Sequence, residues 1–199
     1  VMTTDRLSGE QRMRELGFPN PAPLMKSYNP EKAQKLFAAF VKNGTWQTPT
    51  LSLIKSFLDE KVDLRPYVYL RDLDAEGLAG FRARLAMLLD RYKILVRDMH
   101  KAGVEFLAGT DSGPQTPNRP GSSLHDELEL FVEAGLTPAE ALRTATLNPA
   151  RYFRVEADAG TVEVGKSADL VILDANPLTD IKATRKIRDL MLRGVYYPH

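Results

Sequence analysis

The chain has 199 residues, which is enough for one well-buried domain or for one domain with a small appendage. Hydrophobic residues make up 43% and charged residues 27%, a balance that is typical of globular proteins and argues against a disordered or membrane-embedded chain. The 27 basic and 26 acidic residues give a net charge of +1, so we expect neither nucleic acid nor a membrane as a partner.

The first part of the sequence predicts a loop, a helix and a strand. Residues 1–28 are polar and end in a proline-rich run that resists regular structure. Asn29 provides a helix N-cap, apolar residues then recur on one helical face, and Gly44 ends the predicted helix. Residues 45–51 are rich in β-branched and aromatic side chains, which favours a strand with Pro49 near its end.

A long helix and a second strand are predicted next. Residues 74–101 carry a broad apolar stripe at helical spacing, and Gly103 follows as a stop signal. Residues 104–108 form a short apolar run, which is typical of a buried strand. The alternation of helix and strand indicates a parallel α/β arrangement, and residues 109–121 predict a loop.

The last part of the chain changes character after residue 149. Before that point, Ser122 or Ser123 can cap a helix that runs to Ala134, and Thr137 to Glu140 form a capping box for another. Beyond it, short strands separated by turns are predicted at residues 160–165, 169–173 and 187–197. The predicted boundary therefore divides the chain into residues 1–155 and 156–199.

The compartment of the protein stays open. The absence of cysteine excludes disulfides and cysteine-based zinc sites, and it favours a reducing compartment such as the cytoplasm. No basic region precedes an apolar run at the start, and no run of about 18 apolar residues occurs, so no signal peptide or membrane span is visible. A signal on a longer precursor would leave no trace in this sequence.

Asp111 is the candidate for chemistry that the local sequence favours most. It lies just past the predicted buried strand 104–108, and active sites of barrels and open α/β sheets assemble at the carboxyl ends of such strands. The alternative is structural, because Asp before Ser and Gly often caps a turn through its own backbone. The local sequence alone leaves both interpretations open.

Five stretches in a fixed order resemble the amidohydrolase superfamily. The first is Gly-Thr-Asp-Ser-Gly at 109–113, and the others are residues 124–142, 144–150, 160–174 and 176–178. Each stretch alone is a weak signal, whereas their order and spacing together are specific. The similarity is greatest to imidazolonepropionase-like and Xaa-Pro dipeptidase-like members.

This resemblance implies a fold. Such proteins form a distorted (β/α)8 TIM-like barrel and a small β-sandwich made from both chain ends. The resemblance makes residues 45–51 the seventh barrel strand and residues 104–108 the eighth. Residues 1–155 would then be the C-terminal part of the barrel, and residues 156–199 the C-terminal share of the sandwich.

The resemblance also implies a metal centre, of which this sequence carries one ligand. Asp111 matches the aspartate on the eighth strand, but the histidines are His100, His125 and His199, with no His-x-His pair. One carboxylate cannot hold a catalytic zinc ion, which normally has three protein ligands. We therefore expect a divalent metal such as zinc in the complete protein and none tightly bound by this chain alone.

The implied function is hydrolysis of an amide, lactam or dipeptide C–N bond by metal-activated water, with Asp111 as metal ligand and proton acceptor. As a C-terminal piece, the chain is expected to be inactive alone and to associate, either with the missing N-terminal half or with copies of itself. The alternative is a non-catalytic or degenerate module that binds a partner chain through the partial barrel. The coding sequence before Val1 distinguishes the two.

Two further residues are candidates for substrate contact. His125 follows the Asp111 loop closely enough to face the same mouth, although a solvent-exposed helix residue is the simpler interpretation. Trp46, together with Tyr67 and Tyr69, could line a substrate pocket, although aromatic residues near buried strands usually belong to the core. His100 near a helix end is interpreted as structural, and the terminal His199 carries no prediction.

Overall fold

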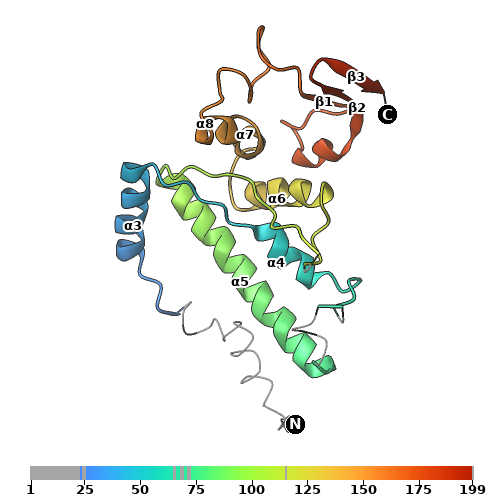
Figure 1. Cartoon of the computed structure of the whole chain (residues 1–199). Helices are drawn as coiled ribbons and strands as arrows, with labels where there is room; N and C mark the ends of the chain where they lie inside the picture. Colours follow the sequence, from blue (N-terminus) through green and yellow to red (C-terminus); the bar gives the residue numbers. More distant parts are fainter. Residues whose placement is uncertain are drawn as a thin grey trace, which may run out of the picture.

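The computed structural model describes residues 23, 26–64, 66, 67, 70, 73–114 and 116–198. This part of the chain consists mainly of helices, with one small sheet near the carboxyl end (Figure 1). The elements are α3 (Pro30–Asn43), α4 (Leu51–Leu58), α5 (Ala75–Lys101), α6 (Ser122–Glu133), α7 (Pro138–Ala145), α8 (Leu147–Tyr152), β1 (Leu170–Leu173), the 3-10 helix η1 (Ile181–Arg185), β2 (Ile187–Leu192) and β3 (Val195–Pro198). None of the helices in these ranges is both long and apolar enough to cross a bilayer.

The predicted start and end signals of α3 and the predicted capping box of α7 are confirmed. The Asn29 side chain accepts a hydrogen bond from Lys32 N at 2.9 Å, and Gly44 ends α3 in the left-handed region with φ 60°. The side chain of Thr137 and that of Glu140 form the reciprocal capping box of α7. For α6, in contrast, Gly121 occupies the N-cap and no side-chain cap is present, so the predicted serine cap is wrong.

The two predicted barrel strands lie side by side but are less regular than expected. They share one isolated parallel bridge between Gln47 and Phe106, in which Gln47 N donates to Glu105 O and Leu107 N donates to Gln47 O. The first strand was placed too far along the chain, because Leu51 already begins α4. A parallel strand gains regularity from neighbours on both sides, and within the described residues each segment is bridged to the other alone.

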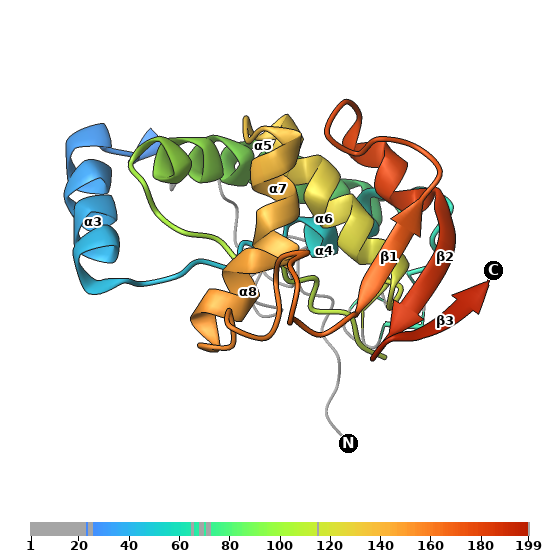
Figure 2. The same cartoon turned by 90° about the horizontal axis from the view of Figure 1, so that it is seen from above.

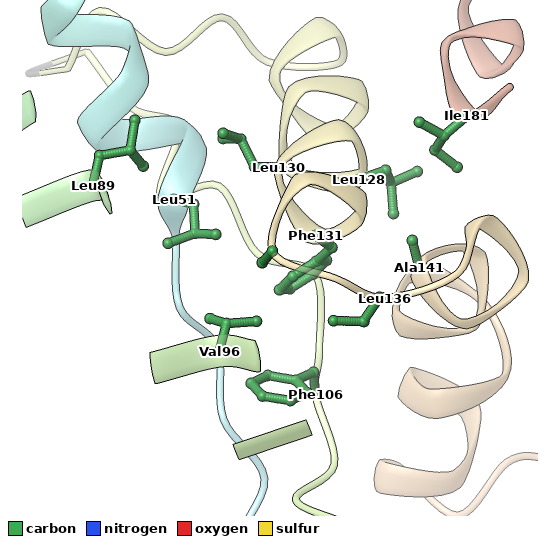
Figure 3. Close-up of a cluster of buried hydrophobic side chains, with 11 residues drawn as sticks. Leu51, Leu89, Val96, Phe106, Leu128, Leu130, Phe131, Leu136, Ala141 and Ile181 are labelled. Atoms are coloured by element: carbon green, nitrogen blue, oxygen red, sulfur yellow. The ribbon is translucent and has the colours of Figure 1, made fainter. Parts of the chain in front are cut away.

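The main core lies around α6 (Figure 3). Phe131 of α6 is fully buried, and its ring centroid lies 5.8 Å from that of Phe106. The other buried members are Leu51, Leu89, Val96, Leu128, Leu130, Ala134, Leu136, Ala141 and Ile181. In a second cluster of buried side chains, centred on Phe81, the N-terminal part of α5 packs against α4. Both extended segments are therefore attached to a helical layer.

The sheet is antiparallel in the order β1-β2-β3 and packs beside α6 (Figure 2). Its attachment runs through η1: Ile181 belongs to the core around α6, and Arg185 forms ion pairs with Asp126 and Glu129 of that helix at 2.9 and 2.8 Å. Residues 169–173 and 187–197 form strands as predicted, within a residue or two.

The strand predicted at residues 160–165 is wrong. This stretch consists of turns and irregular chain, with Gly160 and Gly165 at φ 92° and 93°. Its alternating valines, Val162 and Val164, are exposed. Apolar alternation predicts a strand only if one face has something to pack against, and positive φ at both glycines favours turns.

Candidate active site

Asp111 lies directly after the extended segment 104–110, at the end of that segment that follows the parallel bridge. Its residue is exposed, and its backbone adopts the left-handed conformation with φ 50°. Few residues other than glycine adopt this region, although Asp and Asn tolerate it better than most. Such backbone strain persists only where the surroundings determine it, and it gathers at functional sites.

Hydrogen bonds hold the residues on both sides of Asp111. The hydroxyl of Ser112 lies 2.8 Å from that of Thr110 and 2.8 Å from that of Ser123 in α6. The side-chain amide of Asn118 donates to the Thr110 carbonyl. Hydrogen bonds therefore connect the Asp111 loop to Ser123 at the start of α6, and to Asn118 further along the same loop.

A cluster of buried polar side chains lies beneath this loop. We call Ser52, Asn118, Ser123 and Glu127 the polar cluster; each is at most 5% exposed. The Glu127 carboxylate accepts hydrogen bonds from the backbone N–H groups of Leu51 and Ser52 at 3.0 and 2.6 Å. Burying a polar group is costly unless it has a hydrogen-bonding partner. We therefore interpret the gathering of these four side chains at one edge of the two extended segments as an organised hydrogen-bonding site.

Opposing effects act on the Glu127 carboxyl group. Burial raises its pKa above the ordinary value of 4.5, whereas the hydrogen bonds from Ser52 and Leu51 lower the pKa; burial is the larger effect. Sequence reasoning missed both Glu127 and Asn118. The one signal for Glu127 in the sequence was an acidic residue within the apolar pattern of α6.

A groove of about 730 Å³ adjoins the loop on the side of α4 and α6. Ser52, Asn118 and Ser123 of the polar cluster contribute to its wall. The wall also carries charged groups, among them Lys55, Arg119, Asp126 and Arg185. Asp111 itself is not among the residues that line this groove.

The other predicted site residues have partners of their own. Nδ1 of His125 lies 2.9 Å from the Thr184 hydroxyl of η1. Burial lowers the pKa of His125 most, and the positive charge of the nearby Arg185 lowers this pKa further. Trp46 packs edge-on against Tyr152, the last residue of α8, with ring centroids 6.0 Å apart. The structure thus directs His125 toward η1 and Trp46 toward the α8 side.

The remaining predictions on aromatic and histidine residues fall in three places. Tyr67 packs against Phe57 in the second core cluster, with centroids 5.9 Å apart. Nε2 of His100 lies 3.4 Å from a carboxylate oxygen of Glu140, away from Asp111 and near the start of the 104–110 segment. Tyr69 and His199 lie outside the described residues.

The described residues supply one candidate metal ligand and not a whole site. No three His, Cys, Asp or Glu side chains within them gather closely enough to hold an ion. The exposed carboxylate of Asp111 suits a single oxygen ligand, and a catalytic site of the usual kind needs further protein ligands. Those would have to come from elsewhere.

Comparison with known proteins gives one consistent result. The model of the Amidohydrolase family matches residues 38–196. Ochratoxinase from Aspergillus niger is 37% identical over 102 residues, which are 50% of this chain and 20% of that protein. Imidazolonepropionase from Sphingopyxis alaskensis is 41% identical over 80 residues, 40% of this chain and 19% of that protein.

Solved structures agree with these relatives. A Xaa-Pro dipeptidase with bound methionine in the active site superposes with a TM-score of 0.64 at 25% identity, covering 83% of this chain and 37% of that one. The A. niger ochratoxinase structure gives a TM-score of 0.60 at 28% identity, over 81% of this chain and 34% of that one.

The chain thus spans about a fifth of the length of these curated relatives and little more than a third of these solved structures. Its helices and three-stranded sheet correspond to part of their fold. Since the family match covers most of the 199 residues, the chain belongs to the amidohydrolase family.

Proposed function

We propose that this chain supplies one part of the active site of a metal-dependent hydrolase that cleaves the C–N bond of a small amide, cyclic amide or dipeptide. The observation that carries the proposal is the exposed Asp111 carboxylate, held in a left-handed turn directly after a segment bridged in parallel. The family match and the similarity to the Xaa-Pro dipeptidase structure support hydrolysis.

This chain would form one part of the fold, and other polypeptide would form the rest. The segment with Gln47 serves as the seventh strand of a barrel, the segment with Phe106 as the eighth, and residues 156–199 as a share of a sandwich. The parallel bridge between Gln47 and Phe106 supports the first two assignments. The remaining strands come from a longer form of this chain or from a partner chain.

Members of the family generally use divalent metal ions, and Asp111 is the residue of this chain that would hold one. When bound, such an ion would polarise the scissile carbonyl and lower the pKa of a bound water toward neutrality. Zinc fits this role, and the His or further carboxylate ligands have to come from outside the described part of the chain. The exposure of Asp111 leaves its second carboxylate oxygen free for proton transfer.

Asp111 then acts as the proton carrier. Its carboxylate accepts the proton of the water that attacks the carbonyl carbon, and passes this proton to the nitrogen of the leaving amine as the C–N bond breaks. The products are a carboxylic acid, which keeps the second proton of the water, and an amine, and Asp111 returns to its charged form. His125 and Trp46 remain candidates for substrate contact, although His125 contacts Thr184 and Trp46 packs against Tyr152 in this structure.

The first test reads the coding sequence upstream of Val1 for a strand that carries His-x-His. The second measures hydrolysis by the assembled protein with Asp111→Asn, which removes the charge and keeps the shape. We expect kcat to fall by about 10²–10⁴-fold, the usual contribution of a general base. Asp90→Asn, on the exposed face of α5, is the matched control and should retain activity. Full activity of the Asp111 variant would overturn the proposal.

A third test uses this chain alone. After expression with added zinc and exhaustive dialysis, we expect no stoichiometric metal in the purified chain or in its Asp111→Ala variant. Stoichiometric metal that this substitution weakens would mean that the chain completes a site by itself, and the proposed division of ligands would be wrong. If the upstream sequence lacks a His-x-His strand, the alternative of a non-catalytic module that binds a partner is favoured.

A further inference from the structure

We propose that Asn118 is a positioning residue for Asp111, and that the polar cluster holds Asn118 in place for this task. The inference rests on the proposed function of Asp111. Asn118 is 5% exposed, and its side-chain amide donates a hydrogen bond to the carbonyl of Thr110. That carbonyl belongs to the same planar peptide unit as the N–H of Asp111.

This contact acts on the strained angle itself. Rotation about φ of Asp111 turns the Thr110–Asp111 peptide plane relative to the Asp111 side chain. When Asn118 fixes the carbonyl oxygen, it therefore fixes the plane on which φ 50° depends. A non-glycine residue keeps such a conformation only if its surroundings hold it there.

The polar cluster supports Asn118 from behind. The Asn118 amide lies 3.5 Å from the hydroxyl of Ser52, and the backbone N–H of Ser52 donates to Glu127 at 2.6 Å. Ser123, one helical turn before Glu127 in α6, lies 2.8 Å from the hydroxyl of Ser112 on the other side of Asp111. Ser123 of α6 thus contacts one neighbour of Asp111 directly, whereas Glu127 is connected to the other only through Ser52 and Asn118.

Burial makes this arrangement rigid. Glu127 is 0% exposed and Ser52 is 1% exposed, so neither can exchange its protein partners for water. Hydrogen-bonding partners that orient a catalytic ligand typically change activity by about 10–100-fold when removed. Within this network, Asn118 bonds the peptide unit before Asp111, and Ser123 bonds the residue after it.

The test is Asn118→Asp, which keeps the shape of the side chain and replaces its N–H donor with an acceptor. Asn148→Asp is the matched control: Asn148 is also buried, 6% exposed, and donates to a carbonyl of the same segment, that of Phe106, at 2.9 Å. Both variants lose a buried donor to a carbonyl of residues 104–110, and Asn148→Asp also loses the 3.4 Å contact of Asn148 with the Glu105 carboxylate. Asn118→Asp loses the hydrogen bond to Thr110, next to Asp111, whereas Asn148→Asp loses the hydrogen bond to Phe106, further from Asp111.

In the assembled protein, we expect Asn118→Asp to lower kcat by about 10–100-fold with KM changed by less than about twofold, while Asn148→Asp leaves both within about twofold. Thermal unfolding of both variants should shift downward by similar amounts. If Asn118→Asp does not fold, Asn118→Ala takes its place in the same comparison. Equal losses of kcat at the two sites, or none at Asn118, would overturn the proposal.

Nuclear magnetic resonance of this chain provides a readout without activity. We expect the amide resonances of Asp111 and Ser112 to move in Asn118→Asp and to stay in Asn148→Asp, because only the former frees the peptide unit before Asp111. Unmoved resonances in both would contradict the inference. Asp111→Asn separates the two levels: if it is inactive while Asn118→Asp is fully active, the positioning role fails alone; if it is active, the proposed function fails.

Discussion

The carboxylate of Glu127 accepts hydrogen bonds from the backbone N–H groups of Leu51 and Ser52, although Glu127 lies 76 and 75 residues further along the chain. These are the first two residues of α4, whose own N-cap, Thr50, provides no side-chain hydrogen bond. Glu127 therefore caps α4 from another helix, and its negative charge faces the positive end of the helix dipole.

Replacing this cap should destabilise the fold. Glu127→Gln leaves one oxygen and turns an N–H₂ group toward one of the two backbone donors. We expect the free energy of unfolding to fall by about 1–3 kcal/mol, the usual penalty for a buried donor left without a partner. Urea unfolding measures the change. Glu133→Gln, on the exposed end of α6, should change stability by less than about 0.5 kcal/mol, and equal losses at both sites would refute the cap.

The same residue predicts a pH dependence. Burial raises the pKa of Glu127 above 4.5, so the folded state binds this proton more tightly than the unfolded state does. Its contribution is therefore fully present below the unfolded pKa and declines as pH rises through the raised folded pKa. Because Glu127→Gln cannot titrate, we expect the stability of the wild type relative to this variant to fall as pH rises above 4.5. A relative stability that rises instead would mean that the two hydrogen bonds outweigh burial.

Local signals in the sequence predicted α3, α5, α6 and α7, but not α4 or α8, and they could not reveal contacts between distant segments. The N-cap at Asn29 and the capping box at Thr137 each lie within four residues and can be read directly. The role of Glu127 depends on Leu51, and that of Asn118 on a carbonyl across a loop. The valines at 162 and 164 alternate like a strand, but alternation does not reveal the missing packing surface.

Gly109 predicts how closely the two extended segments approach. A Cβ at this position would overlap the Cγ2 methyl of Thr48 on the neighbouring segment. We expect Gly109→Ala to lower stability by about 1–3 kcal/mol, as overpacking of a fixed contact does. Thr48→Ser removes that methyl, so it should restore most of the loss in the double variant. Additive losses in this double-mutant cycle would show that the two residues do not meet.

The strained backbone of Asp111 predicts an inverted order of substitutions. At φ 50° alanine is disfavoured by about 1–2 kcal/mol, whereas glycine adopts this conformation freely. We therefore expect Asp111→Gly to be more stable than Asp111→Ala in thermal unfolding. At Asp90, inside α5, the order should be the usual one, with glycine less stable than alanine by about 1 kcal/mol. The same order at both positions would argue against a left-handed Asp111.

One face of the sheet predicts self-association of the isolated chain. Val171, Leu190 and Tyr197 are cross-strand neighbours on β1, β2 and β3, and they are 57%, 43% and 50% exposed. Contiguous exposed apolar side chains favour contact with another surface, so we expect sedimentation velocity to detect oligomers that grow with concentration. Leu190→Lys should shift the distribution toward monomer. Leu36→Lys, at an equally exposed leucine of α3, is the control and should not. A monomer at every concentration would contradict the prediction, because an apolar row of this kind would then be stable in water without a partner.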